Sequence, residues 1–448
     1  MTSTDDADAV HAGDVDHSQL PPLMRDSSFW GANVTQFLGA FNDNVFKQLM
    51  LLLATPTAAA IAAGEEARDL QGEAMVIFAS AFLLFSGTAG YVADKLSKRT
   101  VIVASKVGEI CVMLLGLAGF YYYDVIGFSG MLCVLFLMGL QSAFFGPAKY
   151  GILPEMLRDG DLPRANGVFL MFTFLAIIFG TAVAGLLLEA LGSKVWLASI
   201  VCVAIAVVGT LSSTLIRRVP VAAPDMRFDW KMAGVSGEMV SLLRKDRALL
   251  GALIVCSMFW MIGGIVQQGV NALGKTQLGL GEGPTSIMAA SIGLGLAIGC
   301  VLGGFLSKGT ISSGVVRTGS IGICTTLIVM ALPGGENRHL LGYPGSVPVL
   351  VLLGIFTGIF IVPIQVALQS LPPREEKGRM IALMNQCTWV GIILGALVYK
   401  ACVVTLDATG GPRSVIFLVT SLIMLPVALF YRPTGDSVRT TSDANAQD

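Results

Sequence analysis

Long apolar runs separated by short polar stretches are the dominant pattern along this chain of 448 residues. A helix needs about 20 predominantly apolar residues to cross the hydrocarbon core of a bilayer, and twelve runs approach or exceed that length. The pattern therefore predicts an all-α integral membrane protein with twelve transmembrane helices. The expected spans are 29–54, 72–94, 100–122, 128–147, 164–190, 194–217, 248–272, 285–306, 314–332, 346–369, 380–402 and 414–431.

A hydrophilic stretch over residues 218–247 is the one long polar interruption between these spans, and we interpret it as a cytosolic linker. It divides the chain into an N-terminal six-helix half, 29–217, and a C-terminal six-helix half, 248–431. Both ends are polar, and residues 1–28 lack the basic region and apolar core of a signal peptide. We therefore expect residues 1–28 and 432–448 to be disordered cytosolic tails.

The distribution of basic residues predicts the orientation, because cytosolic loops carry an excess of Lys and Arg. With both termini in the cytosol, 21 of the 29 basic residues fall on the inner side, in loops, tails or the ends of spans, and six fall on the outer side. The remaining two, Lys47 and Lys106, lie inside predicted spans. This asymmetry supports twelve spans with cytosolic termini.

The composition agrees with a membrane protein and excludes several other classes. The chain is 54% hydrophobic and 13% charged, its mean hydropathy is +0.74, and its net charge is −1, which gives no electrostatic basis for binding nucleic acid. The eight cysteines show no C-x-x-C spacing, and the three histidines lie in predicted tails or loops. We therefore expect no metal site, no cofactor and no histidine-based active site.

Two charges within the first span are the most informative polar feature. Asp43 and Lys47 lie one helical turn apart, with Asn42, Asn44 and Gln48 beside them. At this spacing the carboxylate and the ammonium share a helix face and can partly neutralise each other. Such groups cost roughly 2.5–3.5 kcal/mol each in a spanning helix and usually face the protein interior or a wet cavity. A structural ion pair is one interpretation, and a polar translocation site is the one that the surrounding amides favour.

Other polar residues fall within the predicted spans or at their ends. Lys106 and Glu109, three residues apart in the third span, form a second possible ion pair, with a structural role or a part in gating or proton movement. The first half also places Lys149 at the end of its fourth span. The second half contributes amides alone, namely Gln267, Gln268, Asn271 and Gln365.

The loop after the second span carries the sequence Gly90-Tyr-Val-Ala-Asp94-Lys95-Leu-Ser-Lys98-Arg99. It resembles the GxxxDRxGRR signature of the major facilitator superfamily, with lysine at the first basic place and serine at the second glycine. A weaker echo, Gly303-Gly-Phe-Leu-Ser307-Lys308, follows the eighth span. The resemblance implies two six-helix halves and an Asp94 that pairs with basic groups to hold the cytosolic side shut. The expected gating or structural residues are Gly90, Asp94, Lys95, Lys98, Arg99, Lys106 and Glu109.

The segment from Ser142 to Glu155, SAFFGPAKYGILPE, is similar to the family of bacterial lysophospholipid transporters. Stretches beginning at Gln36, Arg164 and Gly358 agree with that family in the same order. The resemblance implies movement of lysophospholipids such as lysophosphatidylethanolamine across the bacterial cytoplasmic membrane to the inner leaflet by alternating access. It further implies contact with membrane lipids and a separately encoded acyltransferase as partner, and we expect a monomer.

The family pattern carries a carboxylate at Asp43 and a lysine at Lys149. A lysophosphatidylethanolamine headgroup has an ammonium that Asp43 can receive and a phosphate that Lys47 or Lys149 can bind. The chain departs from the pattern at Lys47, where apolar residues are usual, and near Gln267, where an arginine is expected. The candidate substrate-binding residues are therefore Asp43, Asn44, Lys47, Lys149, Gln267, Gln268, Asn271 and Gln365.

Two other functions remain open from the sequence. A proton-coupled major facilitator for a drug or small metabolite would keep the fold and use Asp43 or Glu109 as the proton carrier. Competition between lysolipid and that solute would separate the two transport functions. An integral-membrane acyltransferase would need an HxxxxD pair in its folded part, and the one pair with this spacing, His11 and Asp16, lies in the polar N-terminal tail. We therefore expect a transporter and no enzymatic activity.

Overall fold

The computed structural model describes residues 20–63, 68–223, 226, 237–307, 312–334, 339–372 and 377–433. The predicted tails, except residues 20–28 and 432–433, and the central part of the predicted linker lie outside these ranges. Twelve long helices correspond to the twelve predicted spans: α1 (Ser27–Leu53), α3 (Gln71–Lys95), α4 (Lys98–Tyr121), α5 (Tyr123–Gly151), α7 (Leu162–Leu191), α8 (Trp196–Ser213), α10 (Arg247–Ala272), α11 (Glu282–Ser307), α12 (Ser313–Ala331), α13 (Gly342–Ser370), α14 (Lys377–Thr409) and α15 (Val415–Phe430).

Length and hydropathy confirm the predicted fold class. Eleven helices in the described part of the chain are long and apolar enough to cross a membrane, and α15, with 16 residues, is apolar but shorter. Most helix ends lie within a few residues of the predicted ends, because the width of the bilayer sets the length of each apolar run. The protein is thus a multi-pass membrane protein.

The largest differences from the predicted spans are at two helix ends. Helix α14 continues to Thr409, seven residues beyond the predicted end, and carries Asp407 on this extension. Helix α5 begins at Tyr123, five residues early, because it includes a kink at Gly127. Gly127 has a φ of +63°, in the left-handed region that glycine adopts without steric cost. Three short helices were not predicted: α2 (Ala58–Ala62), α6 (Leu153–Met156) and α9 (Gly237–Lys245).

Packing divides the chain into two compact units whose borders differ from those of the predicted halves. The first unit comprises residues 1–47, 84–180 and 191–234, and the second comprises 48–83, 181–190 and 235–448. Each of α1, α3 and α7 therefore belongs partly to both units. The second unit includes one end of each of these three helices of the N-terminal half.

The first unit is organised around α4, which packs against α5 and α8. A cluster of buried apolar side chains joins α4 and α5 to α1 and α7, and it includes Phe29, Ile102, Phe145 and Phe169. In a bilayer such contacts stabilise the bundle through close van der Waals packing, since lipid tails are as apolar as the core itself. This cluster holds α1 and α5 in a defined register.

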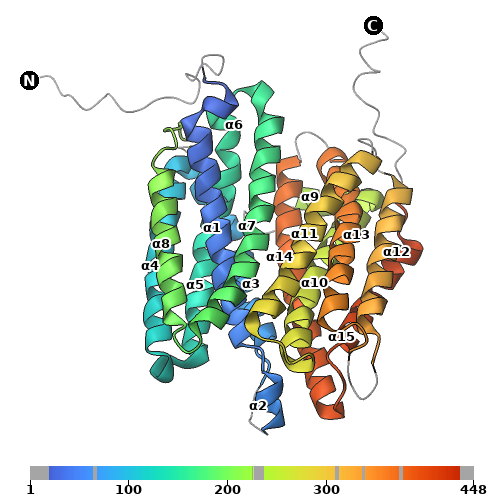
Figure 1. Ribbon diagram of the computed structural model, residues 1–448. Helices are drawn as coiled ribbons and strands as arrows, with labels where there is room; N and C mark the ends of the chain where they lie inside the picture. The colour runs from blue at the N-terminus through green and yellow to red at the C-terminus, as the bar shows by residue number, and fades with distance from the viewer. Residues whose placement is uncertain are drawn as a thin grey trace, which may run out of the picture. The chain divides into compact units, whose positions relative to one another are not determined.

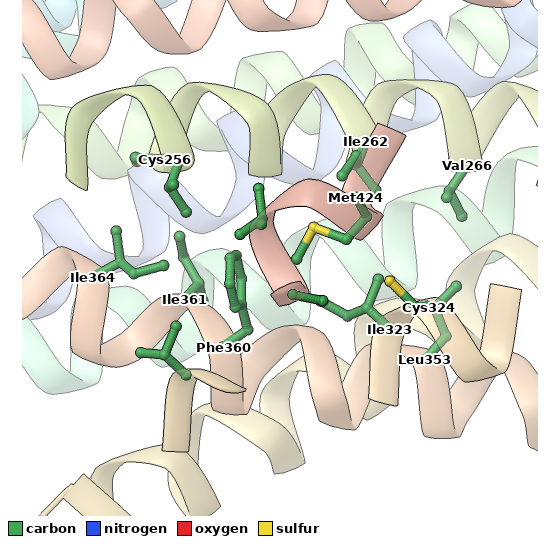
Figure 2. Packing of buried hydrophobic residues seen from close by; sticks show 14 of the residues in the cluster. Cys256, Ile262, Val266, Ile323, Cys324, Leu353, Phe360, Ile361, Ile364 and Met424 are labelled. Atoms are coloured by element: carbon green, nitrogen blue, oxygen red, sulfur yellow. The ribbon is translucent and has the colours of Figure 1, made fainter. Parts of the chain in front are cut away.

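In the second unit α10 packs against α14, and α12 packs against α13 and α15. Figure 2 shows part of the apolar core, where Phe360 of α13, Met424 of α15 and Ile323 of α12 lie close together beneath α10. Next to them, the Ser421 hydroxyl donates to the Cys324 carbonyl oxygen (3.2 Å). These helices therefore form one continuous core.

Helices α11 and α13 lie side by side (Figure 1) at a distance that only glycine permits at several positions. A Cβ on Gly295 or Gly299 of α11 would lie about 2 Å from a carbonyl oxygen of α13: 2.0 Å from that of Val351 and 2.1 Å from that of Ile355. A Cβ on Gly354 or Gly358 of α13 would meet the backbone of α11 at 2.2–2.4 Å. We call these four residues the glycine spine; small residues at four-residue spacing let membrane helices approach this closely.

Candidate functional site

Asp43 of α1 faces α5 within the first unit. Its carboxylate accepts a hydrogen bond from the Ser142 hydroxyl (2.5 Å) and a longer one from the Gln141 side chain (3.3 Å). The side chain is only partly buried. The structure therefore holds the carboxylate in place through neutral donors and leaves part of it accessible to a cationic ligand.

Lys47 and Asn44 lie on the next turn of α1. The Lys47 ammonium donates to the Asn44 side-chain oxygen (3.0 Å), and the Asn44 amide donates to the Ala40 carbonyl oxygen (2.7 Å). Asn44 is buried and Lys47 is partly buried. Asn44 thus orients the ammonium, and Asp43 and Lys47 present charges of opposite sign on neighbouring turns.

Lys149 occupies the last turn of α5 and is flanked by aromatic rings. Its Nζ lies 5.5 Å from the ring centre of Phe145 and 5.0 Å from that of Tyr150, within the range of cation–π attraction. Among the described residues no carboxylate oxygen lies within 4 Å of this nitrogen. The aromatic rings stabilise the cation while leaving it able to bind an anion.

Lys106 and Glu109 form an ion pair in the interior of the first unit, at the spacing that the sequence predicted. Both side chains are almost fully buried, at 1% and 2% exposure. The Asn42 amide donates to the other oxygen of Glu109 (2.8 Å) and to the Cys202 carbonyl (3.2 Å). The pair therefore ties α4 to α1 one residue from Asp43.

Two glycines make room for this buried lysine. A Cβ on Gly39 of α1 would lie 3.2 Å from the Lys106 Nζ, and one on Gly209 of α8 would lie 3.0 Å from it. Both backbones therefore approach the lysine so closely that a larger residue at either position would press against it. The pair is therefore enclosed by α1, α4 and α8.

The amides proposed for the C-terminal half belong to the second unit. On α10, Asn271 and Gln268 are fully buried, and Gln267 is partly exposed. Asn271 accepts a hydrogen bond from Gln48 (2.9 Å), and Gln267 donates a long one to Gln48 (3.4 Å). Gln365 lies on α13 and is partly exposed. Asn271 is thus engaged with other side chains, whereas Gln267 and Gln365 keep accessible surface.

The signature loop from Gly90 to Arg99 lies in the first unit. The Lys98 ammonium pairs with Glu155 and lies 3.9 Å from Asp94, one turn earlier. Arg99 donates to the Thr214 carbonyl oxygen (3.1 Å), and Lys95 donates to that of Met226 (3.0 Å). Among the described residues, Asp94 therefore forms its ion pair with Lys98 of its own loop.

Sequence reasoning did not identify the partners that position the charges. Ser142 and Gln141, which hold Asp43, come 98 or more residues later in the chain. Ser142 opens the segment that resembles the lysophospholipid transporters, so the resemblance was the one signal that pointed to it. Gln71 and Tyr399 form a hydrogen bond in the second unit, and no motif in the sequence pointed to either residue.

Comparison with known families identifies the class of protein. The model of the Major Facilitator Superfamily matches residues 33–396, which is most of the chain. The chain therefore belongs to this superfamily of membrane transporters, in agreement with its twelve apolar helices.

Similarity to individual proteins narrows the class to the family of the lysophospholipid transporter LplT, to which the chain also belongs. The LplT of Klebsiella pneumoniae (strain 342) is 30% identical over 374 residues, covering 82% of this chain and 87% of that protein. The LplT of Enterobacter sp. (strain 638) is 29% identical over 363 residues, covering 78% and 82%. The family predicted from the segment around Lys149 is confirmed.

Solved structures confirm the fold. The nucleoside transporter NupG superposes with a TM-score of 0.62 at 14% identity, covering 89% of this chain and 97% of that one. A bacterial homologue of the human lysosomal transporter Spinster superposes with a TM-score of 0.64 at 14% identity, covering 91% and 96%. At this level of identity the likeness concerns the fold alone.

Proposed function

We propose that this chain transports lysophospholipids, such as lysophosphatidylethanolamine, across the cytoplasmic membrane to the inner leaflet. The observation that carries the proposal is its 30% identity, over most of both chains, to a protein named lysophospholipid transporter. The fold and the family are those of transporters and not of enzymes. Transport without chemical change is therefore the activity to test.

The first unit supports this proposal with charges of both signs. Asp43 is held by neutral donors and can accept hydrogen bonds from the ethanolamine ammonium. Lys149, which lies between aromatic rings, and Lys47 can each bind the phosphate. Charge-assisted hydrogen bonds of this kind are about twice as strong as neutral ones. Asn44 completes the part of the proposed substrate-binding set that lies in the first unit, and the amides of α10 and α13 are proposed on sequence grounds alone.

The proposed mechanism and setting follow from the superfamily. Both termini lie in the cytosol on the orientation that the basic residues favour. Transport proceeds by alternating access, in which the two halves rock around the bound substrate. The class of reaction that consumes the product is re-acylation of the lysolipid, performed by a separately encoded acyltransferase. The transporter works as a monomer in the bacterial inner membrane.

The test is uptake of labelled lysophosphatidylethanolamine by cells that lack their own lysophospholipid transporter. The parent chain should restore uptake. Asp43→Asn and Lys149→Ala should each weaken apparent affinity by about tenfold to a hundredfold, because each removes one charge-assisted contact of roughly 1.5–3 kcal/mol. Uptake is measured against lysolipid concentration at matched expression.

Two substitutions of exposed residues serve as matched controls. Asp124→Asn and Lys194→Ala remove the same charges from exposed positions in the first unit and should leave uptake unchanged. Absence of uptake by a well-expressed parent would overturn the proposed substrate. It would favour the second candidate function, proton-coupled transport of a drug or small metabolite. In that function the partly accessible Asp43 would be the proton carrier.

A further inference from the structure

A chain of hydrogen bonds between side chains runs through the second unit where the end of α1 and the start of α3 meet α10 and α14. The Gln48 amide donates to Asn271 (2.9 Å), and the Asn271 amide donates to Gln71 (3.0 Å). The Gln71 amide then donates to the Tyr399 hydroxyl (2.8 Å). The bonded residues are more than 190 positions apart in sequence, so the chain of bonds joins the two predicted halves.

Asp69, just before α3, ends this chain of bonds. Its carboxylate accepts a hydrogen bond from the Tyr399 hydroxyl (2.6 Å) and one from the Gln71 backbone N–H (3.1 Å). Tyr399 has only 1% of its surface exposed, and Gln48, Gln71 and Asn271 have none. Buried polar groups are costly to leave unpaired, so the network is stable only while all its members remain together.

Further polar contacts surround the network in the same unit. In the π-helical turn η5 (Leu273–Gln277), Lys275 donates to the Leu52 carbonyl oxygen (2.7 Å), and Thr276 donates to that of Pro56 (2.9 Å). On α14, Lys400 pairs with Glu73 of α3 (2.7 Å). The ends of α1 and α3 are therefore fastened to the C-terminal helices by several bonds.

We propose that Asp69, Gln71 and Tyr399 form a latch that closes the extracytoplasmic side of the transporter. On the orientation given by the basic residues, the end of α1 and the start of α3 lie on the side opposite the termini. Opening that side must separate α3 from α14, so the buried Asp69–Tyr399 hydrogen bond has to break, together with the more exposed ion pair of Lys400 with Glu73. The latch requires a transporter of this fold and does not depend on which solute is carried.

The test measures exposure of a buried position and needs no substrate. Ser286 of α11 is fully buried and adjoins Gln48, so Ser286→Cys gives a reporter thiol that impermeant maleimide reaches only when the latch opens. Tyr399→Phe removes one hydroxyl and keeps the ring. It should raise the labelling rate at position 286 by about tenfold or more, because a hydrogen bond to a charged group is lost. Asp69→Ala should do the same.

Two controls separate latch opening from unfolding. Tyr343→Phe, at the start of α13, removes a tyrosine hydroxyl elsewhere in the second unit and should leave the rate unchanged. Native Cys256, buried in the core of that unit, should stay unlabelled, and mass spectrometry distinguishes the two positions. Unchanged labelling at position 286 in both Tyr399→Phe and Asp69→Ala would overturn the latch. If Cys256 also reacts, the comparison of labelling at position 286 with and without the conservative Asp69→Asn substitution across pH decides instead.

The latch should weaken as pH rises. Burial raises the pKa of Asp69 above its ordinary range, against the lowering effect of the Tyr399 and Gln71 hydrogen bonds and of Arg413. An open latch exposes the carboxylate to water and returns the pKa toward its usual value, so the closed state binds the proton more tightly. Protonation therefore favours closure, and that preference is lost as pH rises through the raised pKa.

Asp69→Asn isolates this titration, because asparagine can still accept the Tyr399 hydrogen bond but does not ionise. The other charges facing Asp69 are paired: Arg413 with Asp407, and Lys275 with Glu282. At each pH the labelling rate at position 286 is measured in Ser286→Cys alone and in Ser286→Cys combined with Asp69→Asn. The ratio of the first rate to the second should rise with pH. A ratio that stays flat over the acidic to neutral range would contradict the assignment of the titration to Asp69.

Discussion

Gly299→Leu is expected to prevent the protein from accumulating in a folded form. A Cβ at this position would lie 2.1 Å from the Ile355 carbonyl oxygen and 2.8 Å from its carbonyl carbon. Backbone atoms cannot rotate away as a side chain can, so α11 and α13 would have to separate along the glycine spine. Overpacking usually costs about 1–3 kcal/mol per site and more where nothing can yield. Expression of monodisperse protein in detergent, followed by size-exclusion chromatography, measures the effect.

Gly304→Leu is the matched control on the same helix. Gly304 is exposed, and a Cβ there would meet nothing within 4 Å, so leucine should be tolerated at this position. Gly299→Ala should give an intermediate result, folded but with a lower melting temperature than the parent. Equal yields and melting temperatures for Gly299→Leu and Gly304→Leu would show that α11 and α13 do not depend on the spine.

The second large effect on stability is expected from substitutions in the buried ion pair of Lys106 and Glu109. Removing one partner leaves an uncompensated charge in the interior, which costs about 3–5 kcal/mol in buried pairs. Lys106→Met and Glu109→Gln should therefore each lower the free energy of unfolding strongly. The double variant should recover most of the loss, because no net charge remains and glutamine can still accept the hydrogen bond from Asn42.

Unfolding in mixed detergent–SDS micelles measures these stabilities, and a double-mutant cycle gives the coupling energy. The pair of Lys400 with Glu73 provides a comparison, since its side chains are 48% and 30% exposed. Exposed pairs contribute about 0–1 kcal/mol, so Lys400→Met should have a small effect. If the effects of the two buried substitutions simply add, the pair is not a mutual stabiliser, and a role in gating or proton movement becomes the better interpretation.

Hydropathy alone predicted the number of spans and most of their ends. The end of α14 was missed because Asp407 interrupts the apolar run beyond residue 402, while in the structure it forms an ion pair with Arg413 that allows the helix to continue. The early start of α5 was missed because glycine at position 127 usually indicates a break. Here it forms a kink within the helix.

The charged residues of the candidate site were predictable from the sequence, but the residues that form hydrogen bonds with them were not. Helical spacing joined Lys106 to Glu109, because residues three apart in a helix share a face whatever the tertiary fold. The bonds of Asp43 to Ser142 and of Tyr399 to Asp69 cross 99 and 330 positions, and no local rule reports such a contact. The spacing of Gly295, Gly299 and Gly303 could have indicated a close helix contact, since it repeats the motif of tightly packed membrane helices.

The position of Lys149 between aromatic rings has a kinetic consequence. A cation held by an internal carboxylate would have to exchange one ionic partner for another each time a phosphate arrived. Among the described residues no carboxylate is bound to Lys149, and the faces of Phe145 and Tyr150 stabilise it without occupying its hydrogen-bond donors. On the proposed function, an arriving headgroup would find no described carboxylate to displace from this ammonium, so its association and release would not be slowed by the rupture of a salt bridge.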